Sequence, residues 1–233
     1  MFNEHSIYIA LLCGSLFFPF LFSFDKKVGF YKKWPQLALA ILIPILFFIP
    51  WDVFFTSHNV WWFNDEFTVG VRFLGLPIEE WLFFYVIPYC GIFVYEVLKA
   101  YFPVLDFNRS LKYLFYGLSV VFVILAIFHF GRWYTSFNLL FNAVFIWIAL
   151  SINEFKRHLT HFFLTYVITF FPMLIVNGVL TSMPVVEYNS EHISQLRLYS
   201  IPVEDFAYYF LLLLMSVCVF EYASMKKEKI VQE

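Results

Sequence analysis

Two stretches of sequence decide how this chain folds: PIEEWLFF at residues 77–84 and PVEDFAYY at residues 202–209. In each stretch, a proline and two acidic residues precede a long apolar run. Proline is favoured at the first position of a helix, and acidic side chains in the first turn interact well with the positive end of the helix dipole. Both stretches therefore predict the start of an apolar helix, and the second follows the first by 125 positions.

The spacing of 125 residues extends well beyond these two motifs. Shifting the sequence by this amount superimposes residues 52–96 on residues 177–221 without a gap. The identities fall on polar residues and prolines rather than on interchangeable Leu and Phe, so chance apolar similarity does not account for them. The matched pairs include Thr56 and Thr181, Asn64 and Asn189, Arg72 and Arg197, Pro77 and Pro202, Glu79 and Glu204, and Glu96 and Glu221. The sequence therefore predicts an internal repeat.

The composition places the chain in a membrane. Of its 233 residues, 62% are hydrophobic and only 14% are charged, compared with about 25% charged residues in a typical soluble domain. These values exclude an ordinary cytosolic domain, a disordered chain and a disulfide-rich secreted fold. The net charge of −2 excludes the clustered basic surface of a nucleic-acid-binding protein. The three widely spaced cysteines, Cys13, Cys90 and Cys218, are interpreted as buried small apolar residues.

Seven apolar stretches are long enough to cross the hydrocarbon core as helices, which takes about 20 residues. They do not alternate polar with apolar residues, as the strands of a membrane β-barrel do. The first stretch lacks the basic flank and the cleavage site of a signal peptide. The predicted spans are residues 6–24, 34–54, 78–98, 111–130, 134–152, 159–180 and 202–223.

The loops between these spans predict the orientation. Loops and tail on one side carry twelve Lys and Arg residues, and those on the other side carry three. By the positive-inside rule, the N-terminus lies outside and the C-terminus in the cytoplasm. We expect an integral, multi-pass protein of a bacterial cell membrane.

Together, the repeat and the spans predict an all-α membrane fold of seven transmembrane helices. Residues 1–110 form a first repeat of three spans, and residues 134–233 form a second. The span in residues 111–133 connects them and restores the direction of the chain, so the two repeats are inserted the same way up. A site shared by both repeats is expected at their interface.

The paired acids of the two motifs are the candidate catalytic residues: Glu79 and Glu80 in the first repeat, and Glu204 and Asp205 in the second. An isolated motif of this kind is explained by ordinary helix-start chemistry. Its recurrence in both halves of the sequence argues for function. Adjacent residues on a helix point about 100° apart, so one acid of each pair can face the interior. Ionisable groups at membrane depth are costly and mark functional sites.

Further polar and aromatic residues lie near the same helix starts. Asp52 and Asn177 occupy matching positions at the outer ends of spans 2 and 6, where they can converge on the acids. Aromatic residues follow the acids by one turn. We expect these residues to bind the substrate: Asp52, Asn177, Phe83, Phe84, Tyr208 and Tyr209.

The remaining titratable residues suggest no second reaction centre. Glu96 and Glu221 lie about 25 Å beyond the motif acids and are interpreted as interface anchors. His158 and His161 stand beside basic residues and are expected among the lipid headgroups. The sequence contains no metal-binding motif and no glycine-rich dinucleotide fingerprint, so we expect neither a metal nor a cofactor.

Protonatable acids in a dry, aromatic site suit the protonation of an alkene. Aromatic faces attract a carbocation without acting as bases or nucleophiles. Exclusion of water prevents hydration of that cation.

At this point the sequence resembles the membrane-integral lycopene β-cyclases. The resemblance rests on Trp51-Asp52, on residues 62–64, on Gly70-Val71, and on residues 75–84 with their PIEE motif. In the second repeat it rests on residues 176–178, on Thr181, on Tyr188-Asn189 and on residues 201–205. It covers nearly the whole chain, and the doubled motif corresponds to the single-chain form of a two-subunit bacterial enzyme. The cyclase domain of fungal bifunctional enzymes is related.

The resemblance implies an isomerase that converts the ψ end groups of lycopene into β-ionone rings, giving β-carotene by way of γ-carotene. The steps are protonation of the terminal double bond, ring closure of the cation and loss of a ring proton, without net redox change. By this analogy Glu79 and Glu204 are the acid or base, and Glu80 and Asp205 support them. The second repeat replaces Trp62-Phe63 by Glu187-Tyr188, which leaves the equivalence of the two halves open.

Two alternatives remain at the sequence level. A carotenoid hydratase would act on the same double bond and let water capture the cation. A non-catalytic seven-helix membrane protein would use the acids only as helix starts. A retinal-binding protein is excluded, since it needs a lysine within a span and all ten lysines lie in loops, flanks or the tail. The oligomeric state is not predicted.

Overall fold

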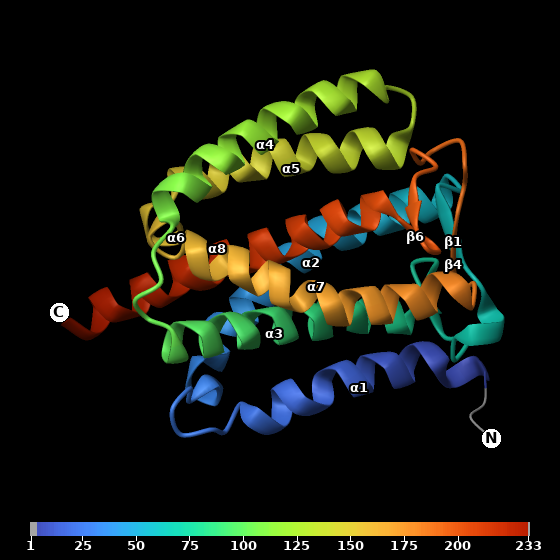
Figure 1. Ribbon diagram of the computed structural model, residues 1–233. Coiled ribbons are helices and arrows are strands. Elements are labelled where there is room, and N and C mark those ends of the chain that lie inside the picture. The colour runs from blue at the N-terminus through green and yellow to red at the C-terminus, as the bar shows by residue number, and fades with distance from the viewer. Residues whose placement is uncertain (1–3, 233) are drawn as a thin grey trace.

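The computed structural model describes residues 4–232, apart from the side chains of residues 154 and 228–232. The fold is a bundle of helices with short strands at one end (Figure 1). The helices are α1 (Ile7–Phe22), α2 (Trp34–Ser57), α3 (Ile78–Tyr101), α4 (Asn108–Phe128), α5 (Trp133–Ser151), α6 (Asn153–Arg157), α7 (Leu159–Ser182) and α8 (Val203–Gln232). The strands are β1 (Trp61–Phe63), β2 (Arg72–Phe73), β3 (Leu76–Pro77), β4 (Val186–Tyr188), β5 (Arg197–Leu198) and β6 (Ile201–Pro202).

Among the described residues, six helices are long and apolar enough to cross a membrane: α2, α3, α4, α5, α7 and α8. The chain is therefore an all-helical, multi-pass membrane protein, as the composition predicted. Helix α1 has 16 residues and spans only about 24 Å, so it does not reach the length of the other six. It ends at Phe22 because the chain turns there: the Ser23 hydroxyl donates to Pro19 O, and Asp25 accepts the amides of Lys27 and Val28.

Helix α8 runs through the middle of the bundle, where it packs against α2, α3, α5 and α7. Helix α4 lies at one edge against α5, and α1 lies at the opposite edge against α3 (Figure 1). The edge position of α1 corrects one prediction. Cys13 is exposed on α1, whereas Cys218 in the central helix is buried, as expected.

The strands gather at one end of the bundle, which we call the strand end. The opposite end, which we call the basic end, carries α6 and the C-terminus (Figure 1). At the strand end, each acidic motif is preceded by a tight hairpin, β2–β3 or β5–β6, in which Arg72 pairs with Pro77 and Arg197 with Pro202. Gly75 has a φ of +84° in the first hairpin turn, a conformation that favours glycine.

These hairpins fix the rotation of the helices that follow them. The Ile78 N–H donates to Val71 O (2.8 Å), and 125 residues later the Val203 N–H donates to Leu196 O (3.0 Å). The side chains after these two anchors are therefore presented in the same way in both copies of the motif.

Strands β1 and β4 join the two halves of the sequence. They pair in antiparallel fashion, with Trp61 opposite Tyr188, Trp62 opposite Glu187, and Phe63 opposite Val186. Trp62 and Glu187, which are 125 residues apart, face each other at the centre of the pair. The two acidic motifs are thereby held at the same end of the bundle.

Candidate active site

A cavity of about 360 Å³ opens beneath the strand end. It runs between α1, α3 and α7, and most of its lining is apolar or aromatic. Polar side chains of both halves of the sequence line the same cavity. They include Tyr8, Asp52, Glu80, Tyr134, Asn177, Tyr188, Asp205 and Tyr208.

The first polar cluster is built around Glu80, which is 8% exposed in the first turn of α3. The hydroxyl of Tyr8, on α1, donates to Glu80 Oε2 (2.6 Å). The side chain of Asp52, on α2, is buried and lines the same cavity. Asp52 also accepts from the hydroxyl of Tyr208 on α8 (2.9 Å). Two carboxyl groups and two phenols thus meet in the first cluster.

The second polar cluster is built around Asp205, at the matching position of α8. Tyr134 on α5 donates to Asp205 Oδ1 (2.8 Å). Asp205 Oδ2 accepts from the Tyr188 hydroxyl (2.9 Å) and from the Asn177 side-chain amide (3.1 Å). Burial raises the pKa of Tyr188 well above its ordinary value, and the neighbouring Asp205 adds to this shift. Tyr188 is therefore a neutral hydrogen-bond donor at physiological pH.

The other two motif acids point away from the cavity. Glu79 Oε1 accepts the backbone N–H of Val69 (2.6 Å), and Glu204 Oε1 accepts that of Ser194 at the same distance. The Thr135 hydroxyl also donates to Glu204 Oε1 (2.5 Å). Neither Glu79 nor Glu204 lines the cavity. The structure therefore places Glu80 and Asp205, rather than Glu79 and Glu204, at the cavity.

Of the four aromatic residues expected to bind the substrate, three line the cavity and one does not. Phe83, Tyr208 and Tyr209 line the cavity. Phe84 does not: its side chain is 0% exposed, and its ring packs 5.6 Å from that of Phe48. Its direction on α3 places Phe84 in the core rather than in the cavity lining.

Three polar residues of the site were missed at the sequence level: Tyr8, Tyr134 and Tyr188. Tyr8 and Tyr134 lie 126 residues apart and each donates to a motif acid, so a search that tolerated one insertion in the repeat would have paired them. Tyr188 is brought to the site by the β1–β4 pairing. No pattern in the sequence predicts that pairing.

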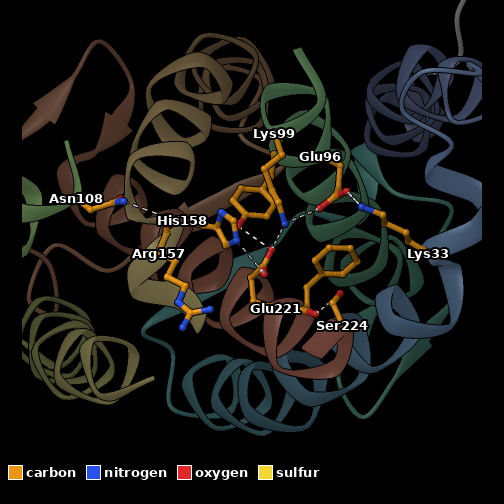
Figure 2. Close-up of polar contacts among 10 residues, drawn as sticks. Lys33, Glu96, Lys99, Asn108, Arg157, His158, Glu221 and Ser224 are labelled. Carbon is orange, nitrogen blue, oxygen red and sulfur yellow. Dashed lines mark hydrogen bonds and ion pairs between the residues drawn. The ribbon is translucent and has the colours of Figure 1, made fainter. Parts of the chain in front are cut away.

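A second group of charged residues lies at the basic end, where Figure 2 shows Glu96, Glu221, Lys99, Lys33 and His158 in contact. Lys99 Nζ lies 2.5 Å from Glu221 Oε1 and 3.4 Å from Glu96 Oε1. Lys33 pairs with Glu96, and His158 Nε2 lies 3.8 Å from Glu221 Oε2. Both glutamates are buried, so they are ion-paired core residues and not interface anchors.

The histidine prediction is corrected at the same place. His161 is buried, and its Nε2 lies 3.0 Å from Phe102 O, while His158 belongs to the charged group. Burial, with the nearby Lys99, lowers the pKa of His158 below its ordinary value. Across the described part of the chain, no three His, Cys, Asp or Glu residues are grouped so as to hold a metal ion.

Comparisons with known proteins agree on one family. A family model described as lycopene cyclase matches residues 5–98 and 131–223. The lycopene beta-cyclase of Halobacterium salinarum is 36% identical over 77 residues, which cover 32% of this chain and 31% of that protein. The bifunctional lycopene cyclase/phytoene synthase of Neurospora crassa is 35% identical over 60 residues, or 26% of this chain and 10% of that protein. The chain thus aligns with less than a third of the length of either relative. No solved structure matches it.

Proposed function

Because the chain belongs to the lycopene cyclase family, we propose that it is a lycopene β-cyclase, which converts the ψ end groups of lycopene and γ-carotene into β-ionone rings. One observation carries the proposal: the acids of both motifs, Glu80 and Asp205, face one apolar cavity. A non-catalytic protein would have no need to bury these acids together around a hollow space, since such burial is costly.

The cavity suits the chemistry of a carbocation. Protonation of the terminal double bond creates the cation, ring closure moves it, and loss of a ring proton ends the reaction. Rings of Trp61, Phe63 and Phe83 line the cavity and would stabilise the cation through their faces. The apolar walls limit water, which favours cyclisation over hydration. Because the product is an isomer of the substrate, the reaction needs no redox cofactor.

The apolar part of the cavity suits the rest of the polyene. Gly14, Phe18 and Pro19 of α1 line it, and so do Pro172 and Met173 of α7. Phe18 is 61% exposed on the outer surface of the bundle. A carotenoid dissolved in the bilayer would therefore reach the acids sideways, between α1 and α7, with its chain remaining in contact with lipid.

The proposed function includes an arrangement in the membrane. We take α1 as a seventh, short span, so that residues 1–110 and 134–233 form two three-helix units inserted the same way up and residues 111–133 connect them. The strand end, with the cavity mouth, would face outward, and the basic end would face the cytoplasm of a bacterial cell. Recurrence of the Val69–Glu79 contact at Ser194–Glu204 supports the two-unit arrangement.

Expression in cells that accumulate lycopene tests the proposal. Cells with the wild-type chain should convert red lycopene into β-carotene, identified by chromatography and mass spectrometry. The Glu80→Gln and Asp205→Asn variants should lose about 100-fold or more of this conversion, the usual contribution of a general acid or base.

A matched control is Glu66→Gln, since Glu66 is an exposed acid at the same end of the bundle that does not line the cavity. Its conversion should equal that of the wild type. Hydroxylated products would show a hydratase instead. Unchanged lycopene, with the protein present in the membrane, would refute an enzymatic role.

A further inference from the structure

The two polar clusters differ in ways that bear on the proposed reaction, which needs one proton donor and one proton acceptor. Assigning one proton transfer to each cluster rests on that proposed function. The clusters differ at positions where the two halves of the sequence have diverged.

The first cluster contains a carboxyl pair. Asp52 is 1% exposed and lines the same cavity as Glu80. It occupies the position that matches Asn177, whose side chain contacts Asp205 in the second cluster. Two carboxylates have no proton between them and repel each other, so a buried pair of this kind holds one shared proton. The hydroxyls of Tyr8 and Tyr208 complete the cluster as neutral donors. This pair is a built-in source of one proton.

The second cluster contains one carboxyl and three neutral donors. Asn177 replaces Asp52 at the matching position, so Asp205 faces an amide and not a second acid. Tyr134 and Tyr188 supply the other two hydrogen bonds. Hydrogen bonds donated to a carboxylate favour its charged form, and a charged carboxylate can accept a proton.

The two clusters lie on adjacent walls of the same cavity. Tyr134, which donates to Asp205, and Tyr208, which donates to Asp52, have ring centroids 6.1 Å apart. Trp61 packs against both rings, at 4.9 and 6.3 Å. A single end group can therefore meet both clusters without leaving the cavity.

We propose that Glu80, sharing a proton with Asp52, protonates the end group and that Asp205 removes the ring proton. In the first step, the Glu80 proton adds to C2 of the terminal double bond and leaves a cation at C1. The C5=C6 electrons then form the C1–C6 bond, which moves the cation to C5. Asp205 takes the proton from C6, whose bonding electrons form the ring double bond. Return of that proton to the Glu80–Asp52 pair completes the cycle.

Solvent deuterium distinguishes the two roles. Membranes containing each variant are incubated with lycopene in D₂O, and both the product and the recovered lycopene are analysed by mass spectrometry. In the Asp205→Asn variant, protonation still occurs and reverses, so the recovered lycopene should gain deuterium while product formation falls about 100-fold or more. In the Glu80→Gln variant, neither deuterium uptake nor product is expected.

The matching positions 52 and 177 allow a pair of reciprocal substitutions. Asp52→Asn gives the first cluster the amide of the second, and it should lower both product formation and deuterium uptake. Asn177→Asp gives Asp205 a carboxyl neighbour, and it should lower product formation but raise deuterium uptake. A purely structural role for these residues would lower both readouts in both variants.

Conservative variants separate the chemistry from misfolding. Glu80→Asp and Asp205→Glu keep the carboxyl and exchange the side-chain lengths of the two halves, and each should recover part of the activity lost in the amide variant. Deuterium uptake by Glu80→Gln, or its absence in Asp205→Asn at wild-type membrane levels, would overturn the assignment. Failure of the wild type to convert lycopene would instead refute the proposed function.

Discussion

Neutralising Glu221 tests how far the charged group at the basic end stabilises the fold. The Glu221 side chain is 7% exposed and contacts Lys99 Nζ at 2.5 Å and the Tyr95 hydroxyl at 2.8 Å. The Glu221→Gln substitution leaves Lys99, which is 22% exposed, with Glu96 at 3.4 Å as its remaining carboxylate partner among the described residues. Removal of one partner from a buried ion pair costs 3–5 kcal/mol, and because Lys99 keeps some solvent we expect a loss of about 3 kcal/mol.

The measurement is thermal unfolding in detergent micelles. For a chain of this size, the expected loss corresponds to a fall of about 6 to 12 °C in the unfolding temperature. The Lys99→Met variant and the Glu221→Gln/Lys99→Met double variant complete a mutant cycle, in which the double variant should lose less than the sum of the single losses. Activity per folded molecule should be preserved, because the charged group lies at the opposite end from the cavity.

A matched comparison comes from Lys33, which pairs with Glu96 but is 40% exposed. Lys33→Met should cost about 1 kcal/mol or less, as exposed ion pairs do. If Glu221→Gln lowered the unfolding temperature no more than Lys33→Met does, burial would not control the strength of these pairs, and the reasoning would be refuted.

Three further predictions concern packing, access and pH. Gly14 lines the cavity, so the Gly14→Trp side chain should obstruct it and reduce conversion of lycopene about tenfold, equivalent to about 1.4 kcal/mol of binding. Gly117 on α4 faces open space, so Gly117→Trp should have no effect in the same assay. Gly91→Ala should destabilise the fold by about 1 to 3 kcal/mol in thermal unfolding, because its Cβ would lie 2.5 Å from Leu213 Cδ1, and Leu213→Ala should relieve this loss. Stability should fall as the pH drops below 6.5, because the lowered pKa of His158 means that the unfolded chain binds more protons than the folded chain in that range. His158→Gln should flatten this part of the curve of stability against pH. An unchanged slope in the variant would contradict the prediction.

Much of the fold could be predicted from the sequence because a membrane imposes a simple rule. A stretch of about 20 apolar residues has to form a helix, and each predicted span does contain one. Prolines and acids marked the start of α3 at Ile78 and that of α8 to within one residue, at 202 rather than Val203. The length of α1 was overestimated, because the turn after Phe22 depends on Ser23 and Asp25, which hydropathy does not weigh.

The site was predictable only in part. Helix geometry indicated that one acid of each motif faces inward, but it did not indicate which one. That choice depends on the hairpins, which set the rotation of α3 and α8, and on the loops that bring Val69 and Ser194 onto Glu79 and Glu204. These contacts join residues only ten positions apart, but they depend on loop and hairpin geometry that hydropathy and helix periodicity do not describe.

The pairing of β1 with β4 has a consequence for how the two halves can evolve. Its register is self-complementary: Trp61 faces Tyr188, and the counterparts of these two residues, Val186 and Phe63, face each other. This is the pattern of a two-fold symmetric dimer interface. In a true homodimer every substitution would occur twice, so an aspartate could never face one cluster while an asparagine faced the other. In a single polypeptide that restriction is absent, so matching positions on the two sides of a self-complementary strand pair can carry different residues, as Asp52 and Asn177 do.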